Sequence, residues 1–418
     1  MRHTYFFALV LFTILLFLSC SRAGWDKISS VPAEIVSSEY QVPEGLPDAR
    51  DWESYVADDK HLDHLPMKRL RVNYHFMNSE DGTRNYNEKK AGEYAYYLTR
   101  DANAKLAENQ AAHLPLHNDI PVYKAQYKYR KTSSTGQEGK KGVYVHYDDE
   151  NYFYVKQGKN KNIGDRTVFK EYGVDMESII NVFMMPHHPD SLKSKTYSGG
   201  LTGVALGMHT KIVTTSPTEV DAWKNCTNFN HELGHILGLP HSWGNDGCDD
   251  TPRHNNECWN FTKNGSKCDS LVSNNLMSYN NFQNSMTPCQ IGRVHMNMAN
   301  NRSRIRKYIM PDWCTFDPEN SITISEKIYW TGNKDLHTDI IIQDGAELYI
   351  CSRISMAPGS RIIVENGGKL ILDKARLHND CGEKWRGIWK SKKGKSEIIF
   401  MNNPLLQDIQ GQTENPES

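Results

Sequence analysis

The stretch HELGHILGLPH, residues 231–241, constrains this chain more than any other feature. His231 and His235 are four residues apart, so on an α-helix both imidazoles lie on one face and can reach a single metal ion. Gly238 lets the chain leave the helix sharply, and His241 can then swing back as a third ligand. Three imidazoles leave a fourth position open for water, which is typical of a catalytic zinc site rather than a closed structural one.

Glu232 lies beside this ligand face. There its carboxylate can polarise a zinc-bound water without being a ligand, which is the role of a general base. The alternative is a helix whose histidines are surface groups or satisfied core groups, and for one histidine that alternative usually holds. Five fixed positions match here. The probability that a chain of this composition contains such a match by chance is on the order of one in ten thousand. The spacing therefore predicts a zinc-dependent hydrolase.

The full pattern, HExxHxxGxxH, resembles the extended zinc motif of the metzincin metallopeptidases. Metzincins also have a methionine-containing turn under the metal, and Met277 in NNLMSYN follows the motif at a fitting distance. Met277 alone would be expected as core filler, but its place after the motif favours the turn. Tyr279 matches a tyrosine that some metzincins place near the metal, which implies that it stabilises the oxyanion or acts as a loose extra ligand.

Two further stretches, NDGCDDTP (245–252) and NNLMSYNNFQNSMTPCQIGRV (274–294), resemble the pappalysin and cytophagalysin branch of this family. Asn245 and Cys248 depart from it, because glycine and an aliphatic residue are common there. The resemblance covers about residues 69–309. It implies an α+β catalytic domain with a twisted mixed sheet and an active-site helix, which cuts peptide bonds in an extended substrate. We expect residues 199–207 to form the edge strand of the cleft.

The cysteines and acidic residues after the motif suggest further features. Eight cysteines remain apart from Cys20, and an even number in an exported chain favours disulfides, although the sequence leaves their connectivity open. The resemblance implies the pairs Cys248–Cys268 and Cys258–Cys289. Clustered carboxylates suit calcium, and family members can bind it in this loop, so a calcium site and a solvated acidic loop are equal alternatives for Asp246, Asp249 and Asp250.

Patterns on either side of the motif predict an α+β domain over residues 68–313. Residues 70–77 alternate apolar and polar side chains, which predicts a half-buried strand. Thr287 followed by Pro288 predicts the start of a helix that runs toward Tyr308. The other expected elements are a helix at 91–106, two strands around a polar turn at 143–155, an apolar strand at 179–185, and a strand near a sheet edge at 203–215.

Residues 314–418 have a different pattern. DIIIQDGAELYI (339–350) and RIIVENGGKLIL (361–372) superpose without gaps at an offset of 22 residues. Short β runs separated by Asp-Gly or Asn-Gly turns at this period predict stacked rungs of a β-solenoid. Because only two clear copies are visible, a small β-sandwich is the alternative.

The N-terminal 23 residues have the pattern of a signal peptide, with a basic start and a short apolar run. Two cleavage sites compete: a lipobox ending at Cys20, which would leave a surface lipoprotein, and a small-x-small site at 21–23, which would release the protein. Both predict a protein outside the cytoplasm. Residues 24–67 are expected to be a linker or a pro-segment.

The charges are balanced, with 49 basic and 50 acidic residues, so the sequence gives no reason to expect a nucleic-acid partner. The alternative to a secreted or surface-anchored zinc endopeptidase is a surface adhesin with a vestigial peptidase domain. Vestigial domains usually lose the glutamate or a histidine ligand. Glu232 and all three histidines are present here, which favours the enzyme.

Overall fold

The computed structural model describes residues 24–32, 40–80, 85–132, 142–197, 199–215 and 217–411. The expected signal peptide, with Cys20, lies outside these residues. The chain divides into two compact units, which we describe separately. The first consists of Val42–Trp313 and Thr331–Leu336, and the second of Met1–Gln41, Cys314–Trp330 and His337–Ser418.

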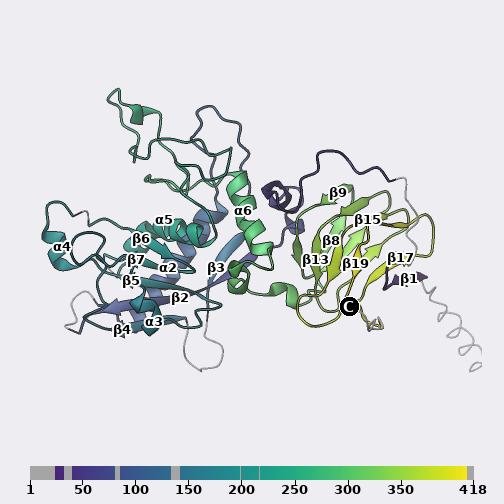
Figure 1. Cartoon of the computed structure of the whole chain (residues 1–418), viewed down its shortest axis with the longest axis horizontal. Helices are drawn as coiled ribbons and strands as arrows, with labels where there is room; N and C mark the ends of the chain where they lie inside the picture. Colours follow the sequence, from purple (N-terminus) through teal and green to yellow (C-terminus); the bar gives the residue numbers. More distant parts are fainter. Residues whose placement is uncertain are drawn as a thin grey trace, which may run out of the picture. The chain divides into compact units, whose positions relative to one another are not determined.

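A six-stranded sheet forms the framework of the first unit (Figure 1). The strands run in the order β3-β2-β5-β7-β6, and β4 also pairs with β2. All pairs are parallel except β6 with β7, so the sheet is mixed, as predicted, and β6 lies at its edge. The strands are β2 (Lys68–Asn78), β3 (Tyr127–Lys131), β4 (Val143–Tyr147), β5 (Ile180–Met185), β6 (Gly203–Leu206) and β7 (His209–Val213).

Both faces of the sheet are covered. On one face lie α2 (Glu88–Ala107) and α5 (Glu219–Ile236), and the ring of Tyr74 on β2 packs on Phe229 of α5. On the other face, the rings of His75 on β2 and Phe169 on α3 (Thr167–Tyr172) pack on Phe183 of β5.

The strand predicted at 70–77 is present as part of β2, but the prediction that it is half-buried is wrong, because β2 is buried on both sides. The polar residues that suggested a solvated face are hydrogen-bonded in the interior instead. His75 Nε2, for example, lies 2.7 Å from Oδ1 of Asn181 on β5. A buried polar group is tolerated when it has such a partner. The prediction of two strands at 143–155 is also wrong, since β4 is followed only by an isolated bridge at Tyr154.

Two helix boundaries matter for the site. The side chain of Thr218 accepts a hydrogen bond from the backbone of Asp221 and caps the start of α5. As predicted, α6 (Pro288–Ala299) begins after Thr287, which forms a capping box with Gln290. It does not run to Tyr308 but ends at Ala299, and a separate 3-10 helix, η4, covers Arg304–Tyr308. The smaller helices of this unit include η1 (Trp52–Tyr55), η2 (Leu62–His64), α4 (Pro189–Lys193) and η3 (Lys267–Asp269).

The second unit is the predicted solenoid, drawn mainly in green to yellow in Figure 1. Its rungs pair in parallel at the offset of 22, with Ile340 opposite Ile362 and Leu348 opposite Leu370. This parallel register excludes the β-sandwich alternative. A disulfide joins Cys314 to Cys381. The strands are β8 (Ser321–Ile324), β9 (Lys327–Trp330), β11 (Asp339–Ile342), β12 (Glu347–Ile350), β13 (Arg353–Met356), β14 (Ile362–Val364), β15 (Lys369–Asp373), β16 (Arg376–His378), β17 (Ile388–Ser391), β18 (Glu397–Met401) and β19 (Leu405–Leu406).

Residues 24–67, expected to be a linker or pro-segment, contribute structure to both units. In the second unit, β1 (Trp25–Ile28) pairs antiparallel with β17 and covers an edge strand of the solenoid. In the first unit, η1 packs on α6 so closely that a Cβ at Gly292 would lie 2.4 Å from the carbonyl oxygen of Trp52. Within the described residues, we find no helix whose length and apolar character would let it span a membrane.

Candidate metal centre and active site

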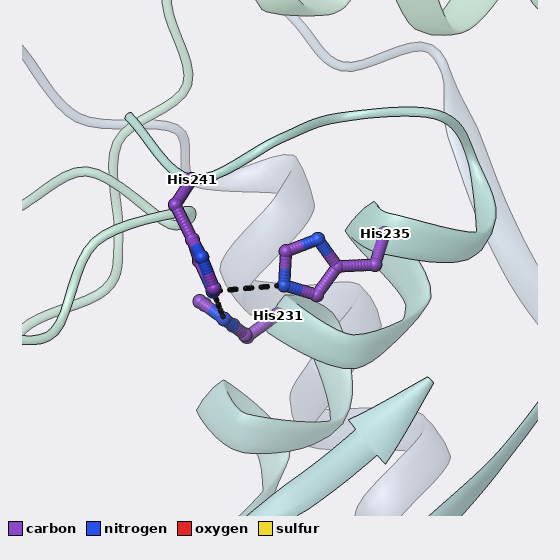
Figure 2. Close-up of side chains that lie close together, drawn as sticks. All are labelled: His231, His235 and His241. Carbon is purple, nitrogen blue, oxygen red and sulfur yellow. Dashed lines mark hydrogen bonds between the residues drawn. The ribbon is translucent and has the colours of Figure 1, made fainter. Parts of the chain in front are cut away.

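Three histidine side chains converge at the end of α5. Two, His231 and His235, lie on the last turns of the helix, and His241 lies on the loop that follows. Gly238 has a φ of +93°, a left-handed conformation that glycine adopts readily, and there the chain turns back. Figure 2 shows the three rings facing one another. Nε2 of His241 is 3.0 Å from Nε2 of His235 and 3.2 Å from Nε2 of His231.

The positions of the protons on these rings show which nitrogen atoms can bind a metal ion. Nδ1 of His231 lies 2.8 Å from the carbonyl of Leu276, and Nδ1 of His235 lies 2.8 Å from the carbonyl of Leu239. A carbonyl only accepts, so each Nδ1 carries the proton and each Nε2 presents a lone pair. The short Nε2–Nε2 contacts cannot then all be hydrogen bonds. Lone pairs that face one point fit a metal ion, and zinc–nitrogen bonds of roughly 2.0–2.1 Å would suit this spacing.

Burial supports the same protonation state. It lowers the pKa of His231 to about 3 and that of His241 to about 4, and it also lowers the pKa of His235. All three rings therefore stay neutral near pH 7, which is the form that binds metal. The predicted ligand residues thus meet in space and fit the ion that their spacing indicates.

Glu232 lies next to these ligands and is almost completely buried. Burial raises the pKa of its carboxyl group to about 7, and a hydrogen bond from the backbone N–H of Ala205 on β6 acts in the opposite direction. The strand comes unusually close, because a Cβ at Gly203 would lie 2.6 Å from Cγ of Glu232. The carboxylate is therefore held between α5 and the edge strand.

Met277 is fully buried beneath α5. A Cβ at Gly234 would lie 2.4 Å from its sulfur, so the helix and the methionine fit only because residue 234 is glycine. The side-chain amides of Asn275 and Gln290 bond each other reciprocally, at 2.8 and 3.0 Å, and tie the turn to α6. Gln283 donates to the carbonyl of Ser278, at 3.0 Å.

The three amide residues Asn275, Gln283 and Gln290 were not among the predicted site residues. Asn275 and Gln290 are partners fifteen residues apart, Gln283 bonds the backbone of its own turn, and only the capping position of Gln290 after Thr287 was a visible local signal.

Tyr279 is 44% exposed and lies near the histidines, with its ring centroid 5.3 Å from that of His241 and 5.9 Å from that of His231. Burial raises the pKa of its phenol, and the charge of Glu232 raises it further. The phenol therefore stays protonated at neutral pH and can donate a hydrogen bond. The ring of Trp243 lies against both His241 and Tyr279, with centroid distances of 3.9 Å and 4.4 Å.

The part of the chain that contains these residues also matches the sequence model of a peptidase family. Residues 211–299 match the sequence model of the peptidase family M43, described as pregnancy-associated plasma protein-A. The matched segment contains the three histidines, Glu232 and Met277, and the match supports a metallopeptidase of the pappalysin type. No curated protein matches the chain.

Several solved structures are also similar to the chain. Mirolysin in complex with compound 9 is 16% identical, over 58% of this chain and 96% of that chain, with a TM-score of 0.39. Mature mirolysin of Tannerella forsythia in complex with a cleaved peptide is 15% identical, over 58% and 95%, with a TM-score of 0.39. A promirolysin mutant from the same organism is 16% identical, over 58% and 84%, with a TM-score of 0.40.

The disulfides of the metallopeptidase unit differ from those expected. Cys248 pairs with Cys289, and Cys258 pairs with Cys268, so both predicted pairs are wrong. The first bond ties the loop that follows His241 to α6. The second closes a local loop between residues ten apart in sequence. The four predicted cysteines do form two bonds, but the chain brings different partners together.

The acidic loop of this metallopeptidase unit does not gather its carboxylates around one point. Asp246 is buried and accepts hydrogen bonds from the hydroxyl of Thr251. Asp250 accepts one from the backbone N–H of Cys289. Asp249 is exposed. Among the described residues, these three aspartates do not form a group that could hold an ion together, so the expected calcium site is not supported.

Proposed function

We propose that this metallopeptidase is a zinc endopeptidase that acts outside the cytoplasm. The observation that carries the proposal is the convergence of three neutral Nε2 atoms beside a buried carboxylate. His231, His235 and His241 would hold the ion, and Glu232, which follows His231 on α5, would serve a water at the open position. This combination is expected of hydrolytic zinc sites.

The residues of the chain can carry the proton transfers. A zinc ion held by the three histidines supplies a Lewis acid that makes a water more acidic and polarises the substrate carbonyl. Glu232 takes a proton as the water attacks the carbonyl carbon, and it passes that proton to the leaving amine. Burial raises the pKa of its carboxyl group, which favours taking up a proton from the water. The phenol of Tyr279 can donate a hydrogen bond to the oxyanion as charge develops.

The edge strand gives the substrate a place to bind. β6 ends the described sheet, and one side of its backbone is paired with β7. An extended peptide can add to the other side through main-chain hydrogen bonds. Because Glu232 lies against Gly203 and Ala205 of this strand, a peptide bound there would run past the carboxylate. This placement supports cleavage within a chain rather than only at its ends.

The compartment follows from the sequence of residues 1–23, which we propose to be a leader that exports the chain. Cleavage before Cys20 would leave a lipid-anchored protein, and cleavage after Ala23 would release it. The three disulfides between described cysteines are consistent with an oxidising compartment.

The test is to incubate the protein with a mixture of unlabelled proteins and to map new N-termini by mass spectrometry. Wild type is compared with Glu232→Ala and with a control on the same helix, Glu219→Ala, whose side chain pairs with Arg100 at the surface. We expect wild type and the control to make the same cuts, and we expect Glu232→Ala to bind zinc without cutting. Cuts that persist in Glu232→Ala would contradict the proposal.

A further inference from the structure

The ring of His241 is held differently from those of the other two histidines. Nδ1 of His231 and Nδ1 of His235 each donate to a backbone carbonyl, which fixes the plane of the ring. No hydrogen bond from Nδ1 of His241 to another described residue is present. His241 also lies beyond the end of α5, so the helix does not set the direction of its side chain.

Trp243 lies against the imidazole of His241. The two ring centroids are 3.9 Å apart and the planes differ by 16°, which is a close parallel stack. The backbone N–H of Ser242, between them, donates to the carbonyl of Met277 at 3.0 Å and fixes the chain at this point. The indole also contacts the ring of Tyr279, with centroids 4.4 Å apart. Trp243 therefore also has a contact that does not involve His241.

We propose that Trp243 is the positioning residue for the third metal ligand. Its indole face restricts the rotation of His241 and keeps Nε2 directed at the point that it shares with His231 and His235. The stack does for this ring what a hydrogen bond to a carbonyl does for the other two. An indole N–H only donates, so Trp243 cannot bind the metal itself and acts through His241. The inference rests on the proposed function, since it assumes that the three histidines hold zinc.

Zinc affinity is the direct readout. Loss of a group that orients a metal ligand typically weakens metal binding by roughly 10–100-fold. We would measure the dissociation constant of zinc by competition with a chromophoric chelator for Trp243→Ala, Trp243→Phe and Trp243→Leu. The control is Trp223→Ala, which removes a tryptophan that is 57% exposed on α5. Thermal unfolding of the metal-free proteins shows which variants keep the fold.

The proposal predicts an order among the variants. Trp243→Ala should bind zinc at least about 10-fold more weakly than wild type, whereas Trp243→Phe, which keeps an aromatic face, should stay within about 3-fold. Trp243→Leu, which fills space without such a face, should resemble the alanine variant. Trp223→Ala should be unchanged.

Wild-type zinc affinity in Trp243→Ala would overturn the inference. If the alanine variant does not fold, equal affinities for the phenylalanine and leucine variants would overturn it. Failure of the proposed function can be told apart from failure of this inference. In that case the wild-type protein itself would bind no zinc or would make no cuts that depend on Glu232.

Discussion

Replacing Gly203 by alanine should damage catalysis without disturbing the metal ligands. A Cβ at this position would lie 2.6 Å from Cγ of Glu232 and 3.1 Å from its Oε1, whereas ordinary contact begins at 3.4 Å. The difference, 3.4 − 2.6 = 0.8 Å, must be taken up by the strand or by the carboxylate. A misplacement of about 1 Å in an active site can cost about 100-fold in rate. We therefore expect kcat/KM to fall by roughly 10–100-fold, or about 1.4–2.7 kcal/mol in transition-state stabilisation.

The assay is the initial rate of cleavage of a peptide that contains a mapped cleavage site, with zinc content measured on the same samples. Gly92→Ala is the matched control, because a Cβ there meets no atom within 4 Å. Gly203→Ala should keep its zinc, since the added methyl group meets Glu232 and not a histidine. A kcat/KM within about 2-fold of wild type would refute the argument that the edge strand positions the carboxylate.

Two further predictions concern stability. Asp335 is buried and accepts hydrogen bonds from Arg306 at 2.7 and 2.8 Å, and Lys68 also forms an ion pair with it. Asp335→Asn would remove the negative charge that faces these two buried cations, so it should lower the free energy of unfolding by about 3–5 kcal/mol. Urea titrations that show a loss below about 1 kcal/mol would contradict this. Burial lowers the pKa of His75 to about 3 and that of His295 to about 4. Below about pH 6.5 these two histidines are therefore protonated in the unfolded chain but stay neutral in the folded chain. The contribution of these histidines to the free energy of unfolding should therefore be at its maximum above about pH 6.5, and on acidification it should fall by up to about 1.4 kcal/mol per pH unit for each of them. A free energy of unfolding that does not change between about pH 7 and 5 would contradict this.

The parts of the fold that could be predicted are those fixed by local spacing. The end of α5 shortly before Gly238 depends on a residue that can adopt a positive φ, and the start of α6 depends on the capping residue Thr287. The solenoid register follows from a repeat that places like residues opposite each other, such as Ile340 and Ile362. The three histidines met as expected because a helix turn and one glycine turn determine where they point.

The parts that could not be predicted depend on contacts between distant segments. The sequence shows polar residues on β2, but it does not show that Oδ1 of Asn181, over a hundred residues later, accepts a hydrogen bond from His75. In the same way, Cys289 bonds Cys248 because α6 lies against the loop after the motif, which no spacing in the sequence reveals.

The most direct test of the central claim is X-ray absorption at the zinc edge on the purified protein. The account predicts about one zinc per chain, bound by three imidazole nitrogens and one water oxygen. His241→Ala should lose one of the nitrogen ligands, and Asp246→Ala should leave the spectrum unchanged. A protein that retains no zinc at stoichiometric loading, or whose zinc is bound by sulfur, would contradict the claim that His231, His235 and His241 form the metal centre.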